Sequence, residues 1–117
     1  MTDLTFYHNP RCSKSRNALQ LLESRGLQPH VVLYLETPPD ANQLHELLRK
    51  LGISARQLLR SGEEAYKSLD LADPQLSEER LIQAMLSHPK LIERPILVAG
   101  ERAIIGRPPE NVLEILQ

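Results

Sequence analysis

The chain has one cysteine and no tryptophan, and aromatic residues make up only 3% of its 117 positions. A single cysteine cannot form an internal disulfide, which favours a reducing, cytoplasmic compartment. Few aromatic side chains and a net charge of −1 argue against nucleic-acid binding. No stretch approaches the roughly 18 apolar residues of a membrane span, and the first ten residues do not resemble a signal peptide. We therefore expect neither a nucleic-acid nor a membrane partner.

The chain has enough aliphatic side chains to form a hydrophobic core. Hydrophobic residues make up 41% of the sequence, which is typical of a globular protein. The length predicts a single domain over residues 1–117. The sequence has no long amphipathic seam of the coiled-coil type, which favours a monomer.

The first third of the sequence predicts a strand, a turn, a helix and a second strand. Residues 4–8 have strand character, and Asn9-Pro10 is a turn signal. Residues 13–25 show helical spacing, with Gly26 placed to end the helix. Residues 30–36 form a continuous apolar run that predicts a buried strand. This order is a βαβ unit with the cysteine at its first turn.

The middle of the chain, about 40–88, predicts a helical insertion. Asp40 is placed to cap a helix that Gly52 ends, and Ser77 is placed to cap a later helix that closes at His88-Pro89. Between them, 53–60 and 63–69 predict two short helices.

The last part predicts a hairpin and a terminal helix. Residues 95–99 and 102–106 flank a Gly-Glu turn, and 107–117 begins with two prolines before an apolar face. The overall order is β-α-β, helical insertion, β-β-α. It predicts an α/β, thioredoxin-like fold with a mixed four-stranded sheet.

Cys12 lies where the first helix should begin, among basic side chains. Free amide groups and the positive end of the helix dipole favour an anion at such a position and lower a thiol pKa. Lys14 and Arg16 lie near the same helix start, where cations are unfavourable unless an anion is close by. We interpret Cys12 as a reactive thiolate. The alternative is a buried small hydrophobic side chain beside a solvated basic helix face.

Other kinds of cysteine chemistry fit the sequence less well. The position that would complete a C-x-x-C pair is Ser15, so a reductant must come from outside the chain. The four histidines are scattered and lack metal-ligand spacing, so we predict no metal site. His8 ends the first predicted strand. It is placed either to pair with the thiolate or to be an exposed strand-end histidine.

The segment YHNPRCSKSR, residues 7–16, resembles the glutaredoxin-coupled arsenate reductase family, whose fold is thioredoxin-like. Further blocks resemble the family in the same order and cover essentially the whole chain: VVLYLETPP, LGISARQLLR, LIQAMLSHPKLIERPILV and GRPPENVLEIL.

The resemblance implies a role for each matching residue. Cys12 matches the nucleophile, and His8 matches the histidine that helps to lower its pKa. Ser15 falls near enough to hydrogen-bond the thiolate. The matching oxyanion-binding residues are Arg60, Arg94 and Arg107, and Arg16 also falls in the motif. Pro95, after Arg94, fits the habit of this fold to carry a proline, often cis, beside the active cysteine.

The implied substrate is arsenate or a similar oxyanion, with no bound cofactor. Glutathione acts as co-substrate and glutaredoxin as partner. Two alternatives stay open. One is a glutathione-linked thiol oxidoreductase acting on another substrate. The other is a regulator of the same fold that binds RNA polymerase, although such regulators typically carry a C-x-x-C pair that this chain lacks.

Two features depart from the family pattern. Arg11 and Ser13 flank the cysteine where the best-known reductases have small residues, typically a glycine after the cysteine. The matched blocks end shortly before Gln117, whereas well-known members continue further. These features place the sequence nearer a shorter branch of the family.

Overall fold

The computed structural model describes residues 4–116, and their contacts form two compact units. The sheet unit comprises the described residues as far as Thr37 and those from Arg94 onward. The helical unit is Pro38–Glu93, slightly wider than the insertion expected at about 40–88. That the whole chain acts as a single domain stays a prediction.

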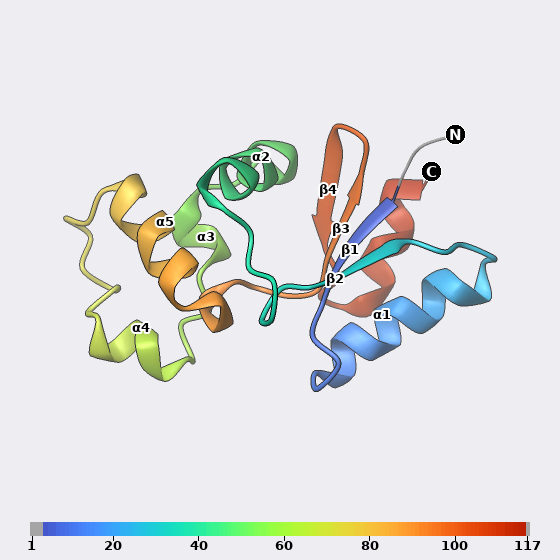
Figure 1. The fold of residues 1–117 in the computed structure, drawn as a ribbon, viewed down its shortest axis with the longest axis horizontal. Coiled ribbons are helices and arrows are strands. Elements are labelled where there is room, and N and C mark those ends of the chain that lie inside the picture. The colour runs from blue at the N-terminus through green and yellow to red at the C-terminus, as the bar shows by residue number, and fades with distance from the viewer. Residues whose placement is uncertain (1–3, 117) are drawn as a thin grey trace. The chain divides into compact units, whose positions relative to one another are not determined.

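The sheet unit contains a four-stranded mixed sheet (Figure 1). Its strands are β1 (Leu4–His8), β2 (His30–Leu33), β3 (Ile96–Ala99) and β4 (Arg102–Ile105), in the order β2-β1-β3-β4. β1 pairs in parallel with β2, and the two other pairs are antiparallel. This arrangement confirms the predicted α/β, thioredoxin-like fold.

Helix α1 (Ser13–Ser24) connects the two parallel strands. It ends as the sequence predicts, at Gly26, which adopts a φ of +77°. The amide groups of Gly26 and Leu27 donate to the carbonyl groups of Glu23 and Leu22, at 2.9 and 3.1 Å. This is the Schellman arrangement, in which a left-handed residue satisfies the last carbonyl groups of a helix.

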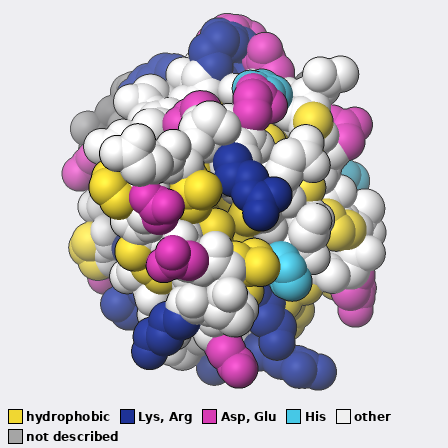
Figure 2. Space-filling view, turned by 90° about the vertical axis from the view of Figure 1, so that its left-hand side faces the viewer, with side chains coloured by type: hydrophobic (Ala, Val, Ile, Leu, Met, Phe, Trp, Pro, Cys, Tyr) yellow, Lys and Arg dark blue, Asp and Glu magenta, His cyan; other side chains and the backbone are white. Residues whose placement is uncertain are grey.

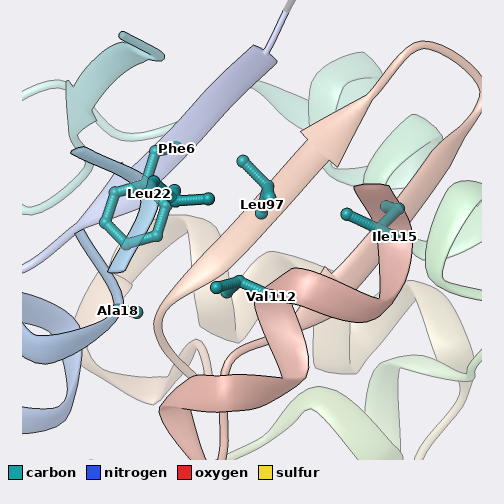
Figure 3. Packing of buried hydrophobic residues seen from close by; sticks show 6 residues of the cluster. All are labelled: Phe6, Ala18, Leu22, Leu97, Val112 and Ile115. Carbon is teal, nitrogen blue, oxygen red and sulfur yellow. The ribbon is translucent and has the colours of Figure 1, made fainter. Parts of the chain in front are cut away.

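The core of the sheet unit lies between one face of the sheet and two helical segments (Figure 3). Phe6 of β1 and Leu97 of β3 are opposite each other in register, so their side chains share a face. Against that face pack α1 and the 3₁₀ segment η2 (Pro109–Leu116). The buried cluster comprises Phe6, Ala18, Leu22, Leu97, Val112 and Ile115. Packing on a shared face fixes α1, and therefore its N-terminus, relative to the strands.

Two sequence predictions in this unit need correction. The strand expected over 30–36 ends at Leu33, because the amide groups of Glu36 and Thr37 both donate to the Leu33 carbonyl and turn the chain. This strand is also not buried as expected. It lies at the edge of the sheet formed by the described strands, next to β1, and Val31 is 38% exposed.

The second correction concerns the terminal helix, which is η2, a 3₁₀ helix rather than an α-helix. Side chains three residues apart lie one above the other in a 3₁₀ helix. Val112 and Ile115 have this spacing and are both buried in the core. The predicted proline in the first turn is present as Pro109.

The helical unit contains α2 (Ala41–Leu51), α3 (Ala55–Leu58), α4 (Glu64–Ser68), α5 (Glu78–Ser87) and η1 (Pro89–Leu91). The predicted caps are confirmed, because Asp40 accepts from the Gln43 amide and Ser77 from the Arg80 amide. Gly52 ends α2 with a φ of +70°. Leucine, isoleucine and methionine side chains from these helices are buried, including Leu44, Leu47, Leu48, Leu58, Leu81, Ile82 and Met85.

Charged side chains of both signs are distributed among hydrophobic ones on the face shown in Figure 2. Along residues 4–116, the helices are too short or too polar for any of them to cross a membrane.

Candidate active site

Cys12 is held at the junction between β1 and α1. The chain leaves β1 at His8, and the Cys12 amide donates to the Asn9 carbonyl across a tight turn, at 3.0 Å. Cys12 then takes the extended conformation of an N-cap residue, with φ −96° and ψ 121°. Its carbonyl accepts the Arg16 amide at 3.0 Å, which starts α1. The cysteine is therefore at the start of the helix, as predicted.

The pKa of the Cys12 thiol is lowered by its surroundings. Burial alone would raise this pKa, but the amide of Ser15 and the guanidinium of Arg94 more than offset that effect. Arg94 acts through both a hydrogen bond and its charge, and the Lys14 amide contributes further. The net effect favours a thiolate.

Two arginines reach Cys12 from the far end of the sequence. The Arg107 Nη2 lies 3.9 Å from the Cys12 Sγ, and the Arg107 Nε donates to the Arg94 carbonyl at 2.7 Å. Both Arg94-Pro95 and Arg107-Pro108 are cis, the first as the resemblance implied. The structure therefore brings Cys12, Arg94 and Arg107 together.

His8 has a different neighbour from the one expected. Its Nδ1 lies 2.7 Å from the Ser15 Oγ, and the residue is 6% exposed, so it is not an exposed strand-end residue. Burial lowers the pKa of His8, and the nearby charge of Arg16 lowers it further against a weaker opposing effect of Glu23. The lowered pKa favours the neutral form of His8. That His8 lowers the pKa of Cys12 stays a prediction.

The Ser15 hydroxyl is committed to groups other than the thiol. Besides its bond to His8, the Oγ accepts the Asn9 amide at 3.1 Å, and Ser15 is fully buried. The contact between Ser15 and Cys12 that lowers the thiol pKa comes from the Ser15 backbone amide. Ser15 therefore does act on the thiol, but through its backbone amide rather than its hydroxyl.

Arg16 fastens the loop that precedes the helix. Its Nη1 donates to the Pro10 carbonyl at 2.8 Å, and the side chain is exposed. Its predicted role in binding an oxyanion stays a prediction.

Arg60 belongs to the helical unit, and its place in the site stays a prediction. Its amide donates to the Leu91 carbonyl at 2.8 Å, beside a bridge between Leu59 and Ile92. Its Nε lies 3.8 Å from the Glu93 carboxylate. Its buried Nη1 has no hydrogen-bond partner among residues 4–116. A buried donor without a partner is costly, which is consistent with a ligand site at this guanidinium.

Three residues position the site and were not identified from the sequence. Asn9 accepts the Arg11 amide through its Oδ1 at 3.0 Å, in addition to its backbone contacts. Asn111 donates from Nδ2 to the Arg107 carbonyl at 3.0 Å. The Gly106 amide donates to the Pro95 carbonyl at 2.8 Å, which joins the two arginine-bearing turns. The Asn-Pro turn signal was the one available clue to such a role.

The part of the chain described by the structure contains no group of three or more His, Cys, Asp or Glu side chains placed to hold a metal. A thiolate is a nucleophile, and guanidinium groups bind tetrahedral oxyanions through paired hydrogen bonds.

Comparison with known proteins places this thioredoxin-like, single-thiol site in a family. The model of the ArsC family matches residues 7–115, and the chain belongs to that family. The uncharacterized protein YfgD of Escherichia coli K12 is 64% identical over 111 residues, covering 94% of this chain and 93% of that protein.

Some relatives named as arsenate reductases are similar over all or nearly all of their length. That of Neisseria meningitidis serogroup B is 48% identical over 117 residues, covering 99% of this chain and 100% of the relative. The solved structure of the arsenate reductase from Vibrio cholerae is 52% identical, with a TM-score of 0.95 over 97% of this chain and 98% of that chain.

Proposed function

We propose that this protein is an arsenate reductase in which the Cys12 thiolate attacks arsenic and glutathione and glutaredoxin supply the electrons. The observation that carries the proposal is the convergence of a thiol of lowered pKa with two guanidinium groups. The full-length similarity to proteins named arsenate reductase supports the choice of arsenate. We further propose that the protein works as a cytoplasmic monomer.

The positive charge of the arginines beside Cys12 has two roles in this reaction. It keeps the thiol ionised, and it attracts an anion that carries about two negative charges near neutral pH, as phosphate groups do. Arg94 and Arg107 bind the arsenate oxygens and stabilise the charge that builds on them. The thiolate then forms a sulfur–arsenic bond, and one arsenate oxygen takes up protons and leaves as water.

The reduction needs thiols that this chain does not contain. Arsenic stays pentavalent after the first step, and its two electrons must come from two thiols that become a disulfide. Glutathione adds to the Cys12 adduct, glutaredoxin resolves the resulting mixed species, and arsenite leaves. The single cysteine of the chain agrees with this dependence on external thiols.

Arg60, Arg16 and His8 complete the proposed site. Arg60 is a third oxyanion ligand, supported by the open donor on its Nη1. Arg16 adds positive charge near the start of α1 and orders the turn through Pro10. His8, through Ser15, sets the position of the helix start and thereby of the thiol.

The first experiment is arsenate-dependent NADPH consumption coupled through glutathione, glutaredoxin and glutathione reductase. We expect turnover in the wild type and none in Cys12→Ser. Absence of turnover in the wild type, with Cys12 still alkylated rapidly at neutral pH, would overturn arsenate as the substrate and indicate a glutathione-linked oxidoreductase acting elsewhere.

The arginines are tested by anion binding. Arg94→Ala should weaken arsenate binding strongly, whereas Arg25→Ala, at the exposed far end of α1, should not. Equal effects in the two variants would contradict the assignment of Arg94 to the oxyanion site.

A further inference from the structure

A groove with both polar and apolar lining, the latter from Leu21 and Pro109, begins at Ser13, the residue after Cys12, and follows α1. Its volume is about 620 Å³, and its walls come from one side of α1 and from the start of η2. Ser13, the residue after Cys12, lines its near end, and Ser24, the last residue of α1, lines its far end. The groove lies wholly within the sheet unit. No step of the mechanism above uses it.

The side chains that line the groove suit a small peptide. Asn17 and Gln20 present amide groups, which hydrogen-bond to peptide groups in either direction. The two charged lining residues have opposite signs, Lys14 on α1 and Glu110 on η2. A ligand that carries carboxylate and ammonium groups on a peptide backbone matches this set of partners.

The length of the groove also suits a tripeptide. From Ser13 to Ser24 the helix rises by roughly 17 Å, at about 1.5 Å per residue. An extended tripeptide spans about 11 Å. A tripeptide lying along α1 can therefore occupy part of the groove while its thiol remains near the cysteine end.

We propose that this groove between α1 and η2 is the binding site for glutathione, with Glu110 pairing with the glutathione ammonium group and Lys14 with a carboxylate. The proposal rests on the proposed function, since it assigns a place to the co-substrate of that reaction. Asn17 and Gln20 bind its peptide groups.

The test uses thiol–disulfide exchange on the full chain, without arsenate. The Cys12 thiolate attacks one sulfur of glutathione disulfide, the sulfur–sulfur bond breaks, and a glutathione thiolate leaves while Cys12 becomes a mixed disulfide. Bis(2-hydroxyethyl) disulfide undergoes the same exchange but has no charged or peptide groups. The ratio of the two second-order rate constants measures recognition and cancels the intrinsic reactivity of the thiol.

We expect the wild type to prefer glutathione disulfide and Glu110→Gln to lower the ratio roughly two- to fivefold, which is the range of an exposed charge pair. The direction in which the ratio of rate constants changes is informative. Glutathione disulfide is a net anion, so general electrostatic attraction predicts that removal of a carboxylate raises the ratio. Glu114→Gln is the matched control, because Glu114 is an exposed carboxylate in the same segment and does not line the groove.

The result that supports the proposal is a fall in Glu110→Gln and in Lys14→Gln with no fall in Glu114→Gln. No preference in the wild type, or a ratio that is unchanged or raised in Glu110→Gln, would overturn it. The two proposals fail separately. Loss of arsenate turnover alone would leave the exchange ratios intact, and loss of the exchange preference would leave the thiolate and oxyanion chemistry intact.

Discussion

At the residue scale, burial raises the pKa of the Cys12 thiol, and the Ser15 amide, the Arg94 guanidinium and the Lys14 amide together more than offset it. The guanidinium of Arg94 lowers its pKa by a hydrogen bond and by charge. We expect the rate of Cys12 alkylation by iodoacetamide to titrate below the value of about 8.5 for a free thiol. Arg94→Ala should move the midpoint upward, because the charge that stabilises the thiolate is lost.

Arg107→Ala and Arg25→Ala complete that series. The Arg107 Nη2 lies at the long distance of 3.9 Å from the sulfur, so its removal should raise the midpoint less than the removal of Arg94 does. Arg25 is exposed at the other end of α1, and its replacement should leave the midpoint unchanged. A free-thiol titration in the wild type would refute the activated nucleophile.

Replacing Ser15 can separate the effect of its hydroxyl from the effect of its backbone amide on the Cys12 thiol. Its hydroxyl bonds to His8 and to the Asn9 amide, whereas its own amide acts on Cys12. Ser15→Ala removes the first set and keeps the second. We expect a loss of about 1–3 kcal/mol in the free energy of unfolding, from buried polar groups left without a partner.

The pKa of Cys12 should change little in the same variant, as measured by the alkylation profile. A large upward shift of the midpoint with unchanged stability would show that the hydroxyl, as first expected from the sequence, acts on the thiolate.

At the scale of the elements, local signals predicted most helices and strands. The caps at Asp40, Ser77 and Gly26 depend on one or two neighbouring residues, and all three are confirmed. The predictions that needed correction depended on tertiary context. The burial of residues 30–36 depends on which strands flank them, and a 3₁₀ segment at the end of the chain depends on how Val112 and Ile115 meet the core.

The turn between β4 and η2 must fit closely against its neighbours at Gly106. A Cβ atom added there would lie 2.9 Å from the Pro95 Cγ and 3.0 Å from the Val112 Cγ1, both in buried side chains. Gly106→Ala should therefore destabilise the protein by about 1–3 kcal/mol, as overpacking does in a dense core. Chemical denaturation measures this change.

Gly62→Ala is the control for that variant. A Cβ atom at Gly62 would meet nothing within 4 Å. Its effect should stay within about 0.5 kcal/mol, as is usual for surface changes. Because Gly106 holds Pro95 through a backbone hydrogen bond, Gly106→Ala should also disturb Arg94 and Arg107 and raise the alkylation midpoint. Equal stability of the two variants would contradict the packing argument.

At the scale of the whole molecule, the site draws on segments far apart in the sequence. Cys12 and Arg107 are 95 residues apart and yet in contact. Spacing along the chain could indicate a thiolate at the helix start, because that argument is local. The arginines were assigned only through the resemblance, since each one alone looks like an ordinary surface cation. The pairing of His8 with Ser15 needed the fold, because it depends on the angle between β1 and α1.

The pH dependence of global stability reports on His8. Because folding lowers the pKa of His8, the unfolded chain takes up a proton there near about pH 6.5, whereas the folded chain does so only at lower pH. The unfolded state then binds more protons, so the free energy of unfolding should fall as the pH drops from about 6.5 toward the folded pKa. Above about pH 6.5 this contribution is fully present.

His8→Gln should reduce the slope of the free energy of unfolding against pH, by an amount equivalent to at most one proton. Urea denaturation between pH 7 and 5 measures this slope. The matched control is His30→Gln, because His30 is exposed at the edge strand. His8→Gln also loses absolute stability, because Ser15 is left with a changed partner. The two variants are therefore compared by the slope of the free energy of unfolding against pH. An unchanged slope in His8→Gln would mean that folding does not lower the pKa of His8.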